Sequence, residues 1–103
     1  MEKKVSFVEE IERINKLRLQ DEREQAQKKL AQTKRMKAGH FVQRKVRIEI
    51  TRKVQAGFIL KHSTEYVIGQ LVWITDNFCR LDNPQPSNLR QIETVRIMSI
   101  ELV

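Results

Sequence analysis

Apolar residues follow one period before Gly39 and another after it. Val8, Ile11, Ile14 and Leu17 recur every three or four residues, which is the spacing of one face of an amphipathic helix. After residue 41, apolar and polar residues alternate, which is typical of half-buried strands. The chain is therefore predicted to be α+β, with a long N-terminal helix followed by a strand-rich domain.

The predicted helix covers residues 7–38, because neither proline nor glycine interrupts this range. Ser6 and Glu9 match a capping box, in which the serine hydroxyl accepts the Glu9 backbone N–H. Gly39 is a suitable residue for the end of the helix. A continuous helix would be about 48 Å long, so a break within residues 20–27 is left open. Leu30 is the one large apolar side chain in residues 20–35, which favours a solvated connector or a segment ordered by a partner.

Six short strands are predicted after the helix, at residues 46–50, 56–60, 66–75, 78–81, 89–92 and 95–102. Gly69 is expected to permit a bend in the long third strand. So many short strands favour a small five- to six-stranded β-barrel, because closure removes exposed edges. The predicted organisation is a helical arm over residues 1–39, a basic linker over 40–45 and the barrel over 46–103.

Basic residues gather between positions 28 and 53, a range that holds one acid, Glu49. The whole chain has 20 Lys and Arg against 13 Asp and Glu, a net charge of +7. Clustered basic side chains attract the phosphate backbone of nucleic acids, and the release of counterions favours binding. The alternative is that the charge keeps a connector solvated. The residues predicted to contact DNA or RNA phosphates are Lys28, Lys29, Lys34, Arg35, Lys37, Arg44, Lys45, Arg47, Arg52 and Lys53.

The apolar face of the first helical turns is predicted to be a contact surface. It could cover one end of the barrel, meet a second copy in a homo-oligomer or lie in a protein partner's groove. Its polar side mixes acids with bases, so a membrane partner is not expected. The residues of this predicted interface are Phe7, Val8, Ile11, Ile14 and Leu17.

The sequence offers no catalytic, metal or cofactor site, so we expect a non-enzymatic protein. Cys79 is the only cysteine and is predicted to be a buried apolar side chain. Asp76 and Asp82 read as turn residues. The longest apolar run, residues 71–74, is too short to span a membrane, and no secretory signal is apparent, so a cytoplasmic location is expected.

Aromatic side chains bear on base recognition. Trp73 and Phe58 are predicted to lie in the core, whereas Tyr66 and Phe41 are the expected exposed rings. None of them is interleaved with the basic residues, so binding dominated by phosphate contacts is expected.

The segment 66–81, followed by Ile92 and residues 95–100, resembles the YolD-like proteins of Gram-positive bacteria and their mobile elements. Residues 46–50 and 57–59 fit the first two strands of that pattern, so the resemblance covers about residues 44–102. It implies a helical segment followed by an Sm-like or SH3-like barrel. It also implies an accessory or adaptor protein found beside translesion DNA polymerases and linked to DNA-damage tolerance. The alternatives are an RNA-binding protein of the Sm and Hfq type and a protein-interaction module that binds no nucleic acid.

Overall fold

The chain folds as an α+β protein, as the sequence predicts. The computed structural model describes residues 4–56 and 59–103, and it describes no side chain within 52–62. Its elements are β1 (Lys4–Ser6), α1 (Val8–Asn15), α2 (Gln20–Ala38), the short 3₁₀ helix η1 (Gly39–Phe41), β2 (Lys45–Ala56), β3 (Ile59–Ile74), β4 (Phe78–Gln85), β5 (Gln91–Glu93), the 3₁₀ helix η2 (Thr94–Arg96) and β6 (Ile97–Leu102).

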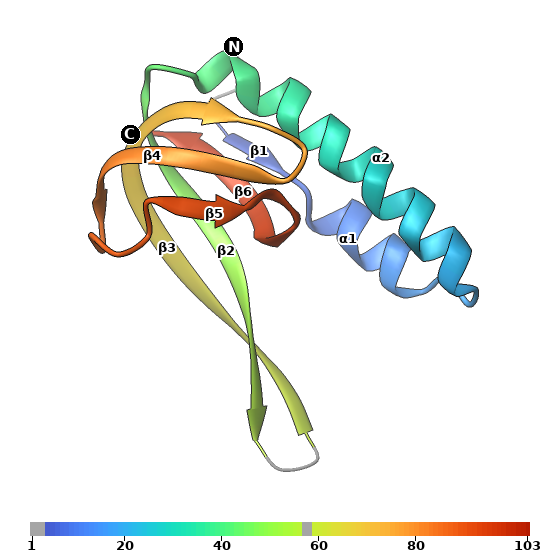
Figure 1. Ribbon diagram of the computed structural model, residues 1–103. Helices are drawn as coiled ribbons and strands as arrows, with labels where there is room; N and C mark the ends of the chain where they lie inside the picture. The colour runs from blue at the N-terminus through green and yellow to red at the C-terminus, as the bar shows by residue number, and fades with distance from the viewer. Residues whose placement is uncertain (1–3, 57–58) are drawn as a thin grey trace.

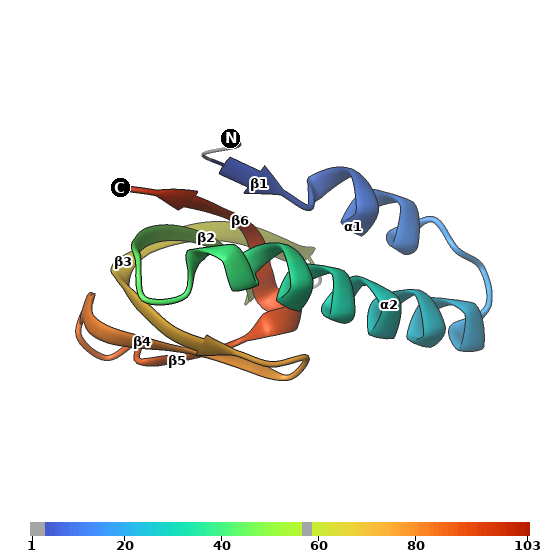
Figure 2. The same ribbon diagram turned by 90° about the horizontal axis from the view of Figure 1, so that it is seen from above.

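The prediction of one long N-terminal helix is wrong, because the chain turns back between Lys16 and Leu19. Leu19 has extended backbone angles, φ −89° and ψ 136°, just before α2 begins. The break therefore lies before the range 20–27 that the sequence left open. Figure 2 shows α1 and α2 side by side. Folding back lets Ile14 of α1 and Leu30 of α2 join the same core, which a straight rod would prevent.

The helix ends differ in detail from the prediction. Ser6 belongs to β1, and its hydroxyl accepts the N–H of Val8 at 3.5 Å, so the predicted capping box with Glu9 is not formed. Helix α2 does end at Ala38, as predicted. Gly39, however, has a right-handed φ of −55° and continues into η1, so the chain does not use a left-handed glycine turn there.

All strand pairs in the sheet are antiparallel, and the strand order is β1-β6-β2-β3-β4-β5. The strands predicted at 56–60 and 66–75 are not separate, because Ala56 ends β2 and Ile59 begins β3 as its direct partner. Gly57 and Phe58, which the sequence placed in that strand, lie outside the described residues. Figure 1 shows β2 and β3 continuing together as a two-stranded ribbon past the other strands.

Gly69 allows two neighbouring strands to approach closely. A Cβ atom at this position would lie 3.2 Å from the Asp82 carbonyl oxygen and 3.2 Å from the Pro84 Cα on β4. The register of β3 against β4 also shifts between Ile68 and Gln70. The absence of a side chain at Gly69 therefore permits the close approach of β4 at the irregular point of β3, where the sequence predicted a bend.

One core joins the helices to the sheet. Its largest fully buried members include Phe7 from the start of the chain, Ile48 from β2, Leu71 from β3 and Ile100 from β6. The described part of the chain therefore has a helical layer and a sheet that share apolar contacts.

Candidate nucleic-acid interface

Five of the predicted phosphate-binding side chains are exposed on α2 and on the segment that leads into β2. Among the side chains that the structure describes, none of the five takes part in an ion pair. Their charges are therefore available to an external anion. These residues are Lys28, Lys29, Lys37, Arg44 and Lys45.

Arg35 and Arg47 are also exposed, but each already has an acidic neighbour. The Arg35 Nε lies 2.9 Å from Asp76 Oδ1, in a geometry that is not a hydrogen bond. Arg47 forms an ion pair with Glu101 on β6. A phosphate at either arginine would compete with a carboxylate, so these two residues supply less free positive charge than the five above.

Lys34 is a correction to the predicted set, because its side chain is 1% exposed. It follows Leu30 by four residues and precedes Ala38 by four, so it falls on the buried side of α2. Its Nζ donates to the carbonyls of Thr94 at 3.3 Å and Val95 at 3.0 Å. It also lies 5.6 Å from the centre of the Phe7 ring. These hydrogen bonds connect α2 to η2, and the buried amine of Lys34 is not accessible to a phosphate.

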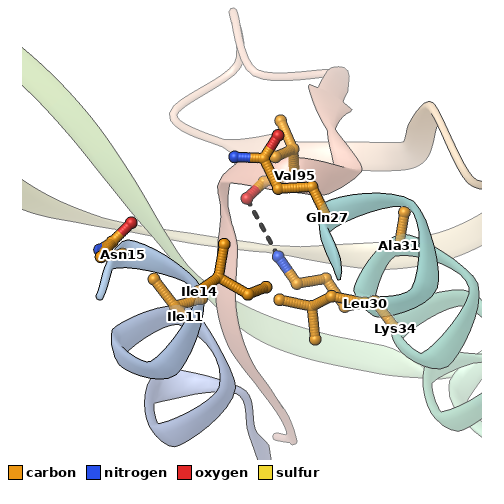
Figure 3. Close-up of a pocket in the computed structure, with 8 residues that line it drawn as sticks. All are labelled: Ile11, Ile14, Asn15, Gln27, Leu30, Ala31, Lys34 and Val95. Carbon is orange, nitrogen blue, oxygen red and sulfur yellow. Dashed lines mark hydrogen bonds between the residues drawn. The ribbon is translucent and has the colours of Figure 1, made fainter. Parts of the chain in front are cut away.

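The surroundings of Lys34 change its protonation. Burial lowers the pKa of Lys34 to about 8, and the negative charge of Glu10 acts in the opposite direction. Figure 3 shows the lysine at the wall of a small cavity between α1, α2 and η2, with the hydrogen bond to Val95 dashed. The cavity has a volume of about 60 Å³, well below the 300 Å³ or more that cofactor sites commonly have.

Arg52 and Lys53 occupy the β2–β3 ribbon, where their backbones pair with Ser63 and His62. Their side chains lie outside the described ones. The prediction that they contact phosphates stays a prediction.

The predicted partner interface is mostly turned inward. Phe7 is fully buried, Ile14 is 6% exposed, and Val8, Ile11 and Leu17 are half-buried. The Phe7 backbone N–H also donates to the Met98 carbonyl at 2.8 Å, which ties the start of α1 to β6. Of the options that the sequence left open, the structure places this face against the chain's own core.

Among the side chains that the structure describes, three aromatic rings lie on the surface, and two of them were unexpected. Tyr66 is 54% exposed, as predicted. Trp73 and Phe78 are each 40% exposed, so the prediction that Trp73 lies in the core is wrong. A register shift between Leu71 and Trp73 breaks the alternation of β3 and puts the tryptophan opposite Arg80. Phe41, predicted to be exposed, is 4% exposed and belongs to the core.

The outer face of β2, β3 and β4 carries a shallow groove of about 520 Å³. Cross-strand pairing sets Lys45, Gln70 and Asp82 in one row across the three strands. The lining is rich in amides and also holds the lysine and the aspartate of that row. The lining residues are Gln43, Lys45, Ile68, Gly69, Gln70, Asp82, Asn83 and Gln85.

Tyr66 stands next to this groove. It precedes the lining residue Ile68 by two positions on β3, so both side chains point to the same face of the strand. The guanidinium of Arg47 lies 5.5 Å from the centre of the Tyr66 ring. The placement of Arg47 beside Tyr66 was not among the expectations from the sequence, although the alternation of β2 and β3 already suggests that Lys45 and Arg47 share a face.

The remaining chemistry is that of a buried thiol. Cys79 is fully buried, as predicted, and burial raises the pKa of its thiol to about 12, while a backbone hydrogen bond from Ile92 acts in the opposite direction. A thiol of this kind stays protonated at neutral pH.

Among the described residues, no three His, Cys, Asp or Glu side chains gather as metal ligands. No helix in that part of the chain is long and apolar enough to cross a bilayer.

No protein-family model matches the chain, and no curated protein or solved structure shows a significant match to it.

Proposed function

We propose that this protein is a non-enzymatic adaptor that contacts nucleic-acid phosphates through the exposed basic side chains of α2 and the segment leading into β2. The observation that carries the proposal is that Lys28, Lys29, Lys37, Arg44 and Lys45 are exposed and have no ion pair among the described side chains. Unpaired surface charge of one sign favours binding to a polyanion, and the free energy comes chiefly from counterion release.

The fold proposed with this function is a rolled, Sm-like or SH3-like unit made of β2 to β6. Strands β2 to β5 follow one another across the sheet, and β6 returns to pair with β2. Such a return supports a rolled sheet around one core. The resemblance to YolD-like proteins adds a proposed setting, in which the adaptor works beside a translesion polymerase or within a mobile element.

A charge-reversal experiment tests the phosphate contacts. We expect Lys28→Glu, Lys29→Glu and Lys37→Glu, combined in one variant, to weaken binding to a labelled duplex in fluorescence anisotropy titrations at several salt concentrations. Each lost contact should reduce the slope of log K against log salt by about 0.9. The matched control is Lys16→Glu, Arg18→Glu and Arg90→Glu, which changes the net charge equally at three exposed positions elsewhere.

A comparison of the two triple variants tells whether nucleic-acid affinity depends on the position of the basic residues or only on the net charge. Equal loss of affinity in both triple variants would assign binding to net charge alone and contradict the proposal. Failure of the unmodified protein to bind at low salt, where screening is weakest, would contradict it as well.

A protein-interaction module is the second candidate function. The exposure of Trp73 and Phe78, both on the β3–β4 hairpin, supports it, because aromatic residues are enriched at protein interfaces. A protein partner whose binding depends on Trp73, together with no binding to DNA or RNA, would favour this candidate over the first.

A further inference from the structure

We propose that the groove on β2, β3 and β4, together with Tyr66, binds the bases of a single-stranded nucleic acid. Lys45, which has no ion pair among the described side chains, would hold a phosphate of the same strand. This inference rests on the proposed function and deepens it, because it names the form of nucleic acid and a second binding surface. It concerns the outer face of the sheet, whereas the phosphate contacts proposed above begin on α2.

Tyr66 provides the stacking surface. Its ring is exposed, yet Arg47 lies 5.5 Å from the ring centre and Glu101 pairs with that arginine. These contacts hold the ring in place before a ligand arrives, which lowers the entropy lost on binding. Any of the bases can stack on an exposed tyrosine, since every base has a π face, so this contact does not require a particular nucleotide sequence.

The lining of the groove suits base edges. Gln43, Gln70, Asn83 and Gln85 supply amides that both donate and accept hydrogen bonds, as the edges of bases do. The Gln70 Nε2 donates to the Gln43 carbonyl at 3.3 Å, so one of these amides is already oriented. In a duplex the pairing edges are occupied, and only a single strand can present them. The volume of about 520 Å³ falls in the usual range for small-ligand sites.

The two charged side chains of the groove suit different parts of a nucleotide, Lys45 the phosphate and Asp82 the base. Lys45 is exposed and has no ion pair among the described side chains, so it can meet a phosphate. Asp82 lies two strands away in the same row and would repel a phosphate, but its carboxylate can accept a hydrogen bond from a base N–H, such as the N3–H of thymine. A neutral sugar would make no use of the charge on Lys45.

The test compares a labelled oligo-dT with a labelled duplex of the same length, using fluorescence anisotropy at low salt. We expect Tyr66→Ala to weaken oligo-dT binding about 5- to 150-fold, the usual effect of removing one stacking partner. Tyr66→Phe keeps the ring and should bind oligo-dT as the unmodified protein does. Duplex binding should not change in either variant. Phe78→Ala is the matched control, since it removes an exposed ring away from the groove.

Each failure has its own meaning. If Tyr66→Ala leaves oligo-dT binding unchanged while the α2 charge reversal weakens it, the base-binding groove is overturned and the proposed function stands. If the unmodified protein binds neither oligo-dT nor the duplex, the base-binding groove and the proposed function are both contradicted. If a neutral oligosaccharide displaces oligo-dT in a Tyr66-dependent manner, the groove is a sugar site and the inference is also overturned.

Discussion

The two sides of α2 carry the same type of residue in opposite environments. Lys34 faces the core, 1% exposed, and its Nζ donates to two carbonyls of η2. Lys37, less than one turn further on, is exposed and has no ion pair among the described side chains. A count of basic residues in the sequence treats them as equal. The comparison teaches that the position of a lysine relative to the apolar stripe decides whether its charge can reach a ligand.

Lys34 also shows how a small protein fills a core with few apolar side chains. Its aliphatic stem can lie among apolar side chains, and its amine donates hydrogen bonds to two carbonyls of η2. The aromatic face of Phe7 provides a further favourable contact with the cation. The desolvation of the amine opposes these gains, and the lowered pKa of Lys34 is the sign of that cost.

The largest expected effect on stability is at Phe7, on the buried side of the comparison. Phe7→Ala removes a fully buried ring and its contact with Lys34, so we expect the free energy of unfolding to fall by about 3–5 kcal/mol. Urea unfolding followed by circular dichroism measures it. Leu19→Ala is the control, because Leu19 is 61% exposed and its loss should cost little.

A decrease of less than about 1 kcal/mol in the free energy of unfolding would contradict the buried position of Phe7. If Phe7→Ala does not fold at all, Phe7→Leu keeps most of the volume and gives a smaller loss that can still be measured.

The next effect is a pH dependence that comes from Lys34. Its pKa is lowered in the folded state to about 8 from a usual value of 10.5, so between these values the unfolded chain binds more protons. Stability from this group therefore rises with pH from about 8 to about 10.5, by up to roughly 3 kcal/mol at 1.4 kcal/mol per pH unit. Lys34→Met lacks this titration and is the reference.

The measurement is urea unfolding of both proteins across that pH range. Groups that both proteins share contribute equally to the two stabilities and cancel in the difference. A difference in stability that stays constant with pH would show that Lys34 is not desolvated, and it would remove the contrast between the two sides of α2.

The sequence predicts the fold class, the end of α2 and most strands, because these follow from local periodicity and from Gly39. It does not predict the turn between Lys16 and Leu19, where neither glycine nor proline stands. That turn is set by packing, since the apolar residues of α1 and Leu30 of α2 can be buried together only if the helices fold back.

The candidate site is predicted only in part, for a similar reason. The exposed lysines of α2 follow from the sequence, whereas the exposure of Trp73 depends on a register shift that alternation cannot reveal. The groove beside Tyr66 depends on which residues of β2, β3 and β4 stand opposite one another, and such long-range register is not a local property. Lys34 was predictable in principle, because it falls four residues after Leu30 and four before Ala38.

The smallest expected effect lies on the exposed side of α2 and completes the comparison. Replacing Lys28, Lys29 and Lys37 together with alanine should change the free energy of unfolding by less than about 0.5 kcal/mol, because these side chains are exposed and have no ion pair among the described side chains. Alanine also favours the helix slightly more than lysine does. Thermal unfolding measures the stability, and anisotropy with a labelled duplex measures the binding of the same sample. A loss of binding without a loss of stability separates the ligand-facing lysines from Lys34, whereas destabilisation by more than about 1 kcal/mol would mean that the exposed lysines also hold the fold together.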